Sequence, residues 1–503
     1  MRAEREKNMK YVSTRDNTLR YDAAQAISMG LSRDGGLFTP IALPKLRPGD
    51  LEAMKDMTYQ QRAVRIMSMY LEDFSEEELR SYADRAYSAQ RFDTPAVAPL
   101  RQVDENTWAL ELWHGPTCAF KDMALQMLPY LLTASLTKTE EEKTVCILVA
   151  TSGDTGKAAL EGFRDVDRTR ILVFYPQDGV SDIQKLQMRT QEGENVGVCA
   201  IEGNFDDAQN GVKALFSDPA LRDTLAKRGF FLSSANSINW GRVLPQVVYY
   251  ISAYCDLLRD GKIEPEDAIN VCVPTGNFGN ILACFYAREM GLPVHRLICA
   301  SNANNVLTDF LNTGRYDRNR PFYTTTSPSM DILISSNLER LLFQLSGQDD
   351  ALVRTYMAQL SSTGAYQVND DILDQIQEIF SAGFCDDSGT QATIGQMMGE
   401  YGYLIDTHTA VAFNVLAQYR ARTGDETPAV VASTASPFKF CNAVLPALGV
   451  TELRPGTGLL DQLAGVTGTP APKPLAELKD KAPRFDLCVE PAGMEQAVLD
   501  FLR

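Results

Sequence analysis

The stretch that decides the fold is "AINVCVPTGNFGNILACFYAREM", residues 268–290. Residues 268–274 form a short apolar run with β-branched side chains, which is typical of a buried strand. Residues 279–290 carry apolar side chains at helical spacing, and Gly276 and Gly279 between the two patterns indicate a tight turn. The stretch therefore predicts a strand that passes directly into a helix, the repeating unit of a parallel α/β sheet.

The same alternation continues on both sides of this stretch. Further apolar runs of strand length occupy residues 144–150, 170–176, 195–201, 295–301 and 429–433. Longer helical patterns, such as "TGKAALEGFR" and "GRVLPQVVYYISAYCDLL", lie between them. Strands that alternate with helices indicate parallel sheets with helices on both faces. We therefore predict an α/β protein of doubly wound architecture.

The remaining segments suggest how the chain is divided. Residues 1–95 combine helical patterns with Pro-rich connections, so we expect a separate, mainly helical N-terminal unit there. We assign residues 146–244 to a small domain, and residues 96–145 with 245–503 to a large domain. The segment 463–483, rich in Gly and Pro, is expected to cross the surface in an extended form.

Composition excludes several functions. The 503 residues are 45% hydrophobic, and 48 basic against 65 acidic residues give a formal charge of −17. A nucleic-acid or anionic-membrane partner would need a basic face, so neither is expected. No apolar run reaches the length of a membrane span. The three histidines show no metal-ligand spacing, so we expect no metal site built from them.

The N-terminus and the cysteines bear on location. Residues 1–16 are charged and lack the apolar core of a signal peptide, although the sequence leaves open a start at Met1 or at Met9. The ten cysteines form no CxxC pair, and several lie within apolar strands, as buried free thiols would. We therefore expect an unprocessed cytoplasmic protein.

A single lysine stands out in "WHGPTCAFKDMA", residues 113–124. A helix is predicted over 120–136, which places Lys121 in its first turn, beside the positive end of the helix dipole. A cation is disfavoured there, so the residue is either simply solvated or kept for its amine. Burial and positive neighbours both lower the pKa of a lysine and leave more of the neutral, nucleophilic amine.

The turn at residues 276–280 is a candidate anion site. Two glycines let the backbone approach a ligand, and the free N–H groups at the start of a helix attract an anion such as a phosphate. The alternative is a tight connection that merely needs glycine. The turn matches neither GxGxxG nor GxxxxGK[ST], so nicotinamide cofactors and nucleoside triphosphates are not expected.

A second strand-to-helix turn, "TSGDTGK", offers Ser152, Asp154 and Thr155. These side chains either cap the following helix or converge on a small anionic or carboxylate group. Lys157 follows at a spacing too short for a P-loop.

Two further stretches end near the same sheet edge. In "SANSINWGR", Asn236, Asn239 and Arg242 either cap a helix and face solvent or bind a phosphate or carboxylate through the arginine. Thr434 follows the strand 429–433. One amine, one phosphate-binding turn and one hydroxyl at a strand end together suit pyridoxal phosphate, which presents an aldehyde, a phosphate and a ring nitrogen.

These stretches also carry a resemblance. "HGPTCAFKD", "ATSGDTG", "SANSINWGR", "PTGNFGN" and "ASTASPFKF", in this order, resemble the threonine synthase family of pyridoxal-phosphate enzymes. The similarity extends to "YVSTRD", "SRDGGLFTP", "SMDILISSNLERLLF" and "DTHTAVAFNVL" and so covers nearly the whole chain. It implies the tryptophan-synthase β-like fold, which is fold type II of the pyridoxal-phosphate enzymes, with a large and a small domain.

The resemblance implies roles for particular residues. Lys121 would bind the cofactor aldehyde as a Schiff base and act as the catalytic base, and Thr434 would face the pyridine nitrogen. Asp154 matches a position that often holds asparagine beside the ring hydroxyl. The phosphate of the cofactor would lie on Gly276, Asn277, Phe278, Gly279 and Asn280.

We also assign the substrate on this basis. Its phosphate is expected on Asn236, Asn239 and Arg242, and its carboxylate on Ser152, Asp154 and Thr155. The chain departs from the family at Asn280, where aspartate is common, and at Lys157, where a small residue is common and the lysine would add positive charge near the substrate. His295 is expected to be structural, and His114 and His408 lie within resembling motifs without an assigned role.

The reaction implied is the conversion of O-phospho-L-homoserine and water to L-threonine and phosphate, by γ-elimination and β-addition of water. Two alternatives remain open at this point. One is a related phospho-lyase that releases 2-oxobutanoate and ammonia, and the other is a non-catalytic relative that only binds ligands. The expected partner is this small-molecule substrate, and the chain is expected to be a monomer or a homodimer.

Overall fold

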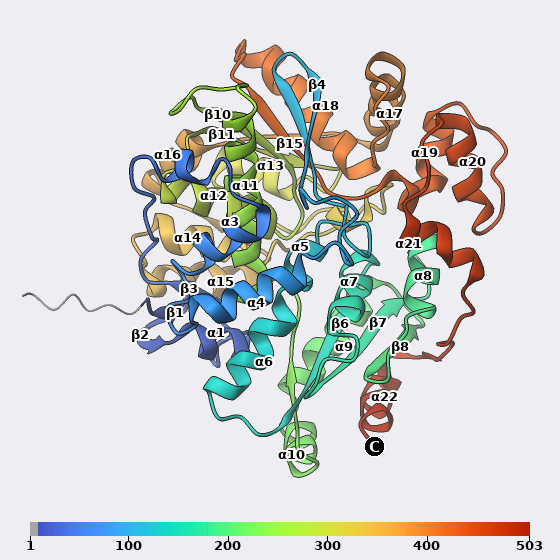
Figure 1. Ribbon diagram of the computed structural model, residues 1–503. Helices are drawn as coiled ribbons and strands as arrows, with labels where there is room; N and C mark the ends of the chain where they lie inside the picture. Colours follow the sequence, from blue (N-terminus) through green and yellow to red (C-terminus); the bar gives the residue numbers. More distant parts are fainter. Residues whose placement is uncertain (1–8, 179) are drawn as a thin grey trace, which may run out of the picture.

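The computed structural model describes residues 9–178 and 180–503 (Figure 1). Residues 1–8, which include half of the charged segment that the sequence analysis singled out and the start at Met1, lie outside the described residues. Two sheets dominate the architecture, and the chain from residue 144 to residue 233 supplies most of one of them.

The larger sheet has six strands in the order β14-β11-β10-β15-β5-β4. All neighbours are parallel except β4 and β5, which pair antiparallel as a hairpin. Its strands are β4 (Leu100–Asp104), β5 (Thr107–Glu111), β10 (Ile269–Pro274), β11 (Val294–Ser301), β14 (Phe380–Phe384) and β15 (Ala429–Ser433).

Both faces of the larger sheet are buried. Val271 and Val273 of β10 join the hydrophobic core that contains α11 (Trp240–Arg259) and α12 (Gly279–Met290). Cys272, between them, joins the core that contains α18 (Thr407–Thr423). Successive side chains of a strand point to opposite faces, so helices cover this sheet on both sides.

The smaller sheet has five parallel strands in the order β16-β8-β7-β6-β9. Its strands are β6 (Thr144–Ala150), β7 (Thr169–Pro176), β8 (Val196–Ile201), β9 (Phe230–Ser233) and β16 (Cys488–Val489). Alternate residues of β6 again enter two different cores, one with α7 (Asp154–Phe163) and one with α9 (Phe205–Ser217) and α22 (Met494–Phe501). Figure 1 shows α22 and the C-terminus beside this sheet.

The N-terminal region is mainly helical, as predicted, but it also contains an antiparallel sheet that the sequence analysis did not predict. The sheet has the order β2-β1-β3, and β1 is fully buried. Its elements are β1 (Tyr11–Ser13), β2 (Asp16–Tyr21), α1 (Ala23–Met29), β3 (Phe38–Pro40), α2 (Asp50–Met54), α3 (Tyr59–Met67) and α4 (Glu76–Ala86).

The structure confirms the α/β class and all six predicted strands. It adds strands that the sequence analysis missed, among them β5, β9 and β14. The domain boundaries stay a prediction, with one correction: β16 lies within residues 245–503, assigned to the large domain, yet pairs with β8 of the smaller sheet.

Two predicted elements were wrong in detail. The helix expected over 120–136 is divided into α5 (Asp122–Leu125) and α6 (Leu128–Lys138), and Pro129 stands in the first turn of α6, where its missing N–H costs nothing. The segment 463–483, expected to be extended, contains the end of α20 (Gly458–Thr467) and the short helix α21 (Lys473–Ala476).

The other elements complete the frame around the sheets. They are α8 (Asp182–Arg189), α10 (Pro219–Lys227), α13 (Val306–Thr313), β12 (Arg315–Asp317), α14 (Leu338–Leu345), α15 (Asp350–Thr363), β13 (Ala365–Gln367), α16 (Asp370–Ile379), α17 (Asp387–Tyr401) and α19 (Cys441–Ala447). Among the described residues, no helix combines the length and the apolar character that crossing a membrane requires.

Candidate active site

One cavity of about 1050 Å³ opens where β6, β9, β10 and β15 end. Ligands of parallel α/β sheets bind at such carboxyl ends. Nearly all of the predicted site residues line this cavity: Lys121, Ser152, Asp154, Thr155, Asn236, Arg242, Gly276, Asn277, Phe278, Gly279, Asn280 and Thr434. The structure therefore brings together side chains that are up to 313 positions apart in the sequence (121 to 434).

Lys121 lies at the N-cap of α5, and its residue surface is only 8% exposed. The segment before it is fixed to the end of β15, because the N–H of Phe120 donates to the carbonyl of Thr434 at 2.8 Å. The Nζ atom lies 3.4 Å from Ser329 Oγ and 3.8 Å from Asp154 Oδ2. Burial lowers the pKa of this lysine to about 8, so the neutral amine is available near neutral pH.

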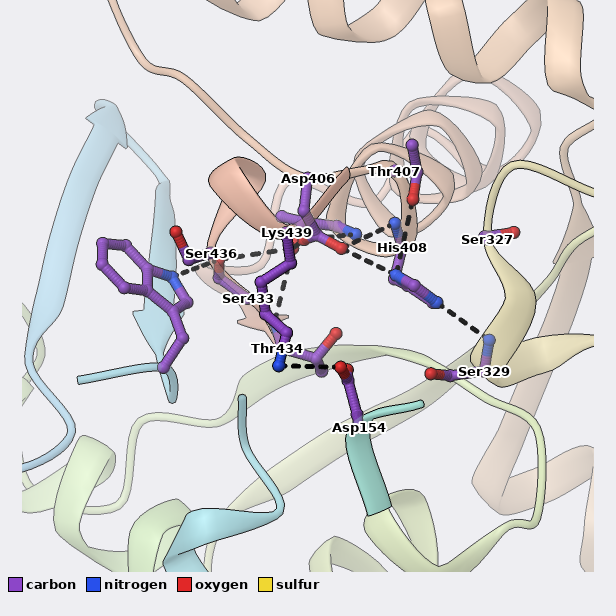
Figure 2. Close-up of polar contacts among 12 residues, drawn as sticks. Asp154, Ser327, Ser329, Asp406, Thr407, His408, Ser433, Thr434, Ser436 and Lys439 are labelled. Carbon is purple, nitrogen blue, oxygen red and sulfur yellow. Dashed lines mark hydrogen bonds and ion pairs between the residues drawn. The ribbon is translucent and has the colours of Figure 1, made fainter. Parts of the chain in front are cut away.

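Asp154, the first residue of α7, is a buried carboxylate with two further partners, of which Figure 2 shows Lys439. Lys439 Nζ and Gln184 Nε2 both donate to its Oδ1 atom, at 2.8 and 2.6 Å. Burial opposes ionisation, but the charges of Lys439 and Lys121 outweigh it and hold the pKa of this carboxyl well below its usual range. Asp154 therefore stays ionised beside the Lys121 amine.

The turn between β10 and α12 is built to accept an anion. A Cβ atom at Gly276 would lie 2.8 Å from the carbonyl oxygen of Ser329, so only glycine fits there. The carbonyl oxygens of Gly276 and Asn277 accept hydrogen bonds from Ser335 Oγ (2.7 Å) and from the N–H of Asn337 (3.1 Å). These carbonyl oxygens are therefore occupied by other residues. The first N–H groups of α12 have no carbonyl acceptor within the helix, so they can donate to a bound anion.

Phe278 and Asn280 complete this turn. Phe278 has a left-handed backbone (φ 63°), which re-aims the chain into the helix. Asn280 Oδ1 accepts hydrogen bonds from the hydroxyls of Tyr249 (2.6 Å) and Tyr250. Its Nδ2 atom is buried with no partner among the described residues. An unpaired buried donor next to an anion-binding turn is suited to a ligand oxygen.

Arg242 and Asn236 line the same cavity, but Asn239 does not. One guanidinium nitrogen of Arg242 donates to the carbonyl of Ala235, and its Nε atom is buried without a partner in the described chain. Burial lowers the pKa of Arg242 to about 10, which still leaves it charged. Asn239 is instead the N-cap of α11, with Oδ1 accepting from Gly241 and Nδ2 donating to Ile27, so its predicted contact with substrate is corrected.

His408 also lines the cavity and holds the neighbouring Ser329 segment in place (Figure 2). Its Nδ1 atom lies 2.8 Å from Asp406 Oδ2, and its Nε2 atom accepts the backbone N–H of Ser329 at 3.2 Å. An Nε2 atom that accepts a hydrogen bond carries no proton, so the proton of the ring lies on Nδ1 and points to Asp406. His408 therefore fixes the segment whose hydroxyl contacts Lys121.

The other histidines and Lys157 lie outside the cavity. His114 bridges Asp93 (2.6 Å) and Glu111 (3.0 Å), and although burial opposes its charged form, these bonds raise the pKa of His114 to about 9. His295, 49% exposed in its side chain, lies in β11. Lys157 pairs with Glu161 at 3.3 Å and with Gln191, which corrects the expectation that it adds positive charge near the substrate.

The sequence analysis missed two residues of this site. Lys439 was quoted within "ASTASPFKF" but not selected, and Ser329 was quoted only as part of a resembling stretch. Lys439 lies in a 3₁₀ turn (Pro437–Phe440) and is 0% exposed. A lysine inside an apolar run was the available signal, since lysines are almost never fully buried unless they are paired.

These residues fit pyridoxal phosphate. An amine of lowered pKa, a turn suited to an anion with an unpaired amide donor, and the Thr434 hydroxyl at the end of β15 face one cavity. Residues 88–434 match the family of pyridoxal-phosphate-dependent enzymes, so fold and site define an enzyme of this class, of fold type II, whose cofactor is pyridoxal phosphate. Residues 10–87 match the threonine synthase N terminus, and residues 409–498 match the threonine synthase C-terminal family.

Comparison with known proteins shows which pyridoxal-phosphate enzymes this chain is similar to. The chain is 39% identical to a threonine synthase of Pseudomonas aeruginosa, over 87% of this chain and 90% of that protein. Its fold matches the crystal structure of a pyridoxal-phosphate-bound threonine synthase from Brucella melitensis, with a TM-score of 0.86, 38% identity and coverage of 99% and 100%. The yeast threonine synthase structure matches with a TM-score of 0.87 at 32% identity, with coverage of 98% of each chain.

The chain belongs to the threonine synthase family. It is also 42% identical, over 86% of its length, to threonine synthase-like 1 of Macaca fascicularis. The match spans 58% of that longer protein.

Proposed function

We propose that this chain converts O-phospho-L-homoserine and water to L-threonine and phosphate. The observation that carries the proposal is the buried Lys121 amine, which shares one cavity with the phosphate-binding turn of residues 276–280. The similarity to the threonine synthase of Pseudomonas aeruginosa over most of both chains supports the choice of reaction.

The cofactor residues are assigned from the same cavity. Lys121 would hold the cofactor by a Schiff base through Nζ, and the turn 276–280 would bind its phosphate through backbone N–H groups and Asn280 Nδ2. Thr434 would face the ring nitrogen with a neutral hydroxyl, which leaves that nitrogen less firmly protonated than a carboxylate would. When bound, pyridoxal phosphate withdraws electrons from the α-carbon of the amino acid.

The substrate is assigned to the remaining polar groups. The substrate carboxylate would lie at the start of α7, on Ser152 and Thr155, where the helix dipole favours an anion. Its phosphate would lie on Arg242 and Asn236, and the unpaired Nε atom of the buried guanidinium supports this choice. We assign Asp154 to the side of the amine and no longer to the substrate carboxylate, because two like charges repel each other.

Proton transfer is assigned to Lys121. Its Nζ atom, once released from the cofactor, would take the proton from the α-carbon. It would then remove a proton from the β-carbon, so that phosphate can leave the γ-carbon before water adds at the β-carbon. A pKa lowered to about 8 suits a base that must act near neutral pH. Ser329 Oγ, 3.4 Å from Nζ and fixed by His408, would orient this amine.

The test is to incubate the purified protein with pyridoxal phosphate and O-phospho-L-homoserine and to measure threonine and phosphate together. Equal yields of threonine and phosphate, lost in Lys121→Ala, are expected. Phosphate with 2-oxobutanoate and ammonia in place of threonine would instead identify a phospho-lyase, and no turnover with retained ligand binding would identify a non-catalytic relative.

The proposal also covers the cellular location and the oligomeric state. We propose a cytoplasmic enzyme that acts on a small molecule, as a monomer or a homodimer. All ten cysteines are free, and nine of them are buried, which supports a reducing compartment.

A further inference from the structure

Three charged side chains meet at the cavity, where Lys121 and Asp154 are among the lining residues and Lys439 lies behind Asp154. Lys121, Asp154 and Lys439 come from α5, α7 and the 3₁₀ turn after β15, and their residue surfaces are 8%, 3% and 0% exposed. Asp154 lies between the two amines, 3.8 Å from Lys121 and 2.8 Å from Lys439. Two buried lysines thus share one carboxylate.

The two oxygens of Asp154 have different partners. Oδ1 accepts from both Lys439 Nζ and Gln184 Nε2, whereas Oδ2 is the atom that lies toward Lys121. Lys439 is itself anchored, because its Nζ atom also donates to the carbonyl of Thr117 at 2.8 Å. The carboxylate is therefore clamped at one oxygen while the other faces the reactive amine.

Charge balance decides which lysine carries a proton. A buried cluster is most stable when its charges cancel, because each unpaired charge costs several kcal/mol of desolvation. Lys439 in its ammonium form and Asp154 in its carboxylate form already cancel. A proton on Lys121 would leave the cluster with a net positive charge.

We propose that Lys439 is a positioning residue for the reaction: by binding Oδ1 of Asp154 and offsetting its charge, it disfavours the ammonium form of Lys121 and so leaves more of the neutral amine. This inference rests on the role proposed above for Lys121. The cofactor is not needed for it, because the clamp is formed by the chain alone.

Other charged groups around Lys121 act in the same cluster. Arg242 of α11 also disfavours a proton on Lys121, whereas Asp154 and the buried Asp406 at the start of α18 favour one. Asp406 is engaged by His408 and by the N–H of Thr409 (3.1 Å), and Arg242 is held by Ala235. Asp154 is the carboxylate that lies within 4 Å of Lys121 Nζ, so its charge matters most.

The test uses the full-length protein freed of cofactor and follows the rate at which a trace of dinitrofluorobenzene labels Lys121, read by peptide mass spectrometry as a function of pH. In Lys439→Met the unclamped carboxylate pairs with Lys121 and stabilises its ammonium form. The pH at which labelling reaches half of its maximal rate, the midpoint, should rise by about one unit. At any pH below the midpoint, labelling should then be about tenfold slower than in the wild type. Lys439→Arg, which keeps the charge, should restore the midpoint.

Two further variants separate this effect from a structural one. Asp154→Asn combined with Lys439→Met should return the midpoint to the wild-type value or below it, because the carboxylate that favours the ammonium form is gone. Lys157→Met is the matched control, since it removes a half-buried, paired lysine of the same region and should leave the midpoint unchanged.

The outcomes decide between the alternatives. An unchanged or lower midpoint in folded Lys439→Met, checked by circular dichroism, would overturn the proposal. If that variant does not fold, Lys439→Gln, which also removes the charge but keeps a polar side chain, takes its place: a higher midpoint supports the proposal, and an unchanged or lower one overturns it. The labelling needs neither cofactor nor substrate, so a failure of the proposed threonine synthesis would leave this result standing.

Discussion

Two turns of this molecule have the same architecture and opposite chemistry. The β6–α7 turn and the β10–α12 turn both lead from the end of a buried parallel strand into a helix, and both line the cavity. The first carries an ionised carboxylate, Asp154, bound to Lys439. The second carries no charged side chain between Thr275 and Asn280 and presents backbone N–H groups with the Asn280 amide.

The difference shows how one fold element serves two purposes. Both helix starts favour an anion. At β10–α12 that place is open to a ligand phosphate, because the carbonyl oxygens of the turn are engaged by residues 335–337. At β6–α7 the protein supplies an anion of its own beside the Lys121 amine, while Ser152 and Thr155 leave part of the turn to a ligand.

Removing the charge from the β6–α7 turn should have the largest effect. Asp154→Asn leaves Lys439 buried without a counterion, which should lower the free energy of unfolding by about 3 kcal/mol. Urea unfolding followed by circular dichroism measures this. The matched change at the uncharged turn, Asn280→Ala, should cost about 1 kcal/mol, the loss of a neutral hydrogen-bond acceptor. Equal costs at the two turns would contradict the comparison.

The second largest effect is expected when a side chain is added in the β10–α12 turn, and it should appear as weaker cofactor binding. In Gly276→Ala the added methyl group meets the carbonyl oxygen of Ser329, so the turn must open, at a cost of about 2 kcal/mol. Affinity for pyridoxal phosphate, measured by equilibrium dialysis, should fall by about thirtyfold. Gly399→Ala in α17, where nothing lies within 4 Å of the added atom, is the control and should bind the cofactor normally.

His408 tests the segment that holds Ser329, because Ser329 contacts Lys121 beside the β6–α7 turn and limits the space at Gly276 in the β10–α12 turn. His408→Phe keeps a ring in the space but removes the acceptor for the Ser329 N–H, at about 1 kcal/mol. We expect kcat to fall by about fivefold to tenfold with KM nearly unchanged. A change confined to KM would mean that His408 contacts the substrate directly.

The smallest effect is expected at Lys157, which follows the β6–α7 turn but pairs with Glu161 away from the cavity. Lys157→Met should leave KM for O-phospho-L-homoserine within about twofold, because no lost contact faces the ligand. A tenfold rise in KM, measured by initial rates of phosphate release, would return this lysine to the substrate site.

The sequence predicted the strands whose apolar runs are long and rich in β-branched residues, such as 144–150 and 268–274. It missed β9, whose side chains are mostly half-buried, and β14, "FSAGF", which has no β-branched residue. It also could not place β16, a two-residue strand that gains its partner only by returning to β8 from the far end of the chain. Such strands exist because of tertiary pairing, which local pattern does not record.

The site was predicted unevenly for a similar reason. Lys121 and the glycine turn carry local signals, a misplaced cation and a pair of glycines. Asn239 and Asn236 look alike in the sequence, yet one caps a helix and the other lines the cavity, and only the three-dimensional path of the chain separates them. Lys439 became visible as a partner of Asp154 only once residues 285 positions apart (154 to 439) were seen side by side.

Reduction of the cofactor-loaded protein with borohydride, followed by peptide mapping, tests the central claim most directly. A buried amine of lowered pKa that shares a cavity with the turn proposed to bind the cofactor phosphate should carry all of the pyridoxyl label, so the label is predicted on the peptide containing Lys121 and on no other. Recovery of the label on a different lysine, or an unlabelled protein that still produces threonine, would contradict the account.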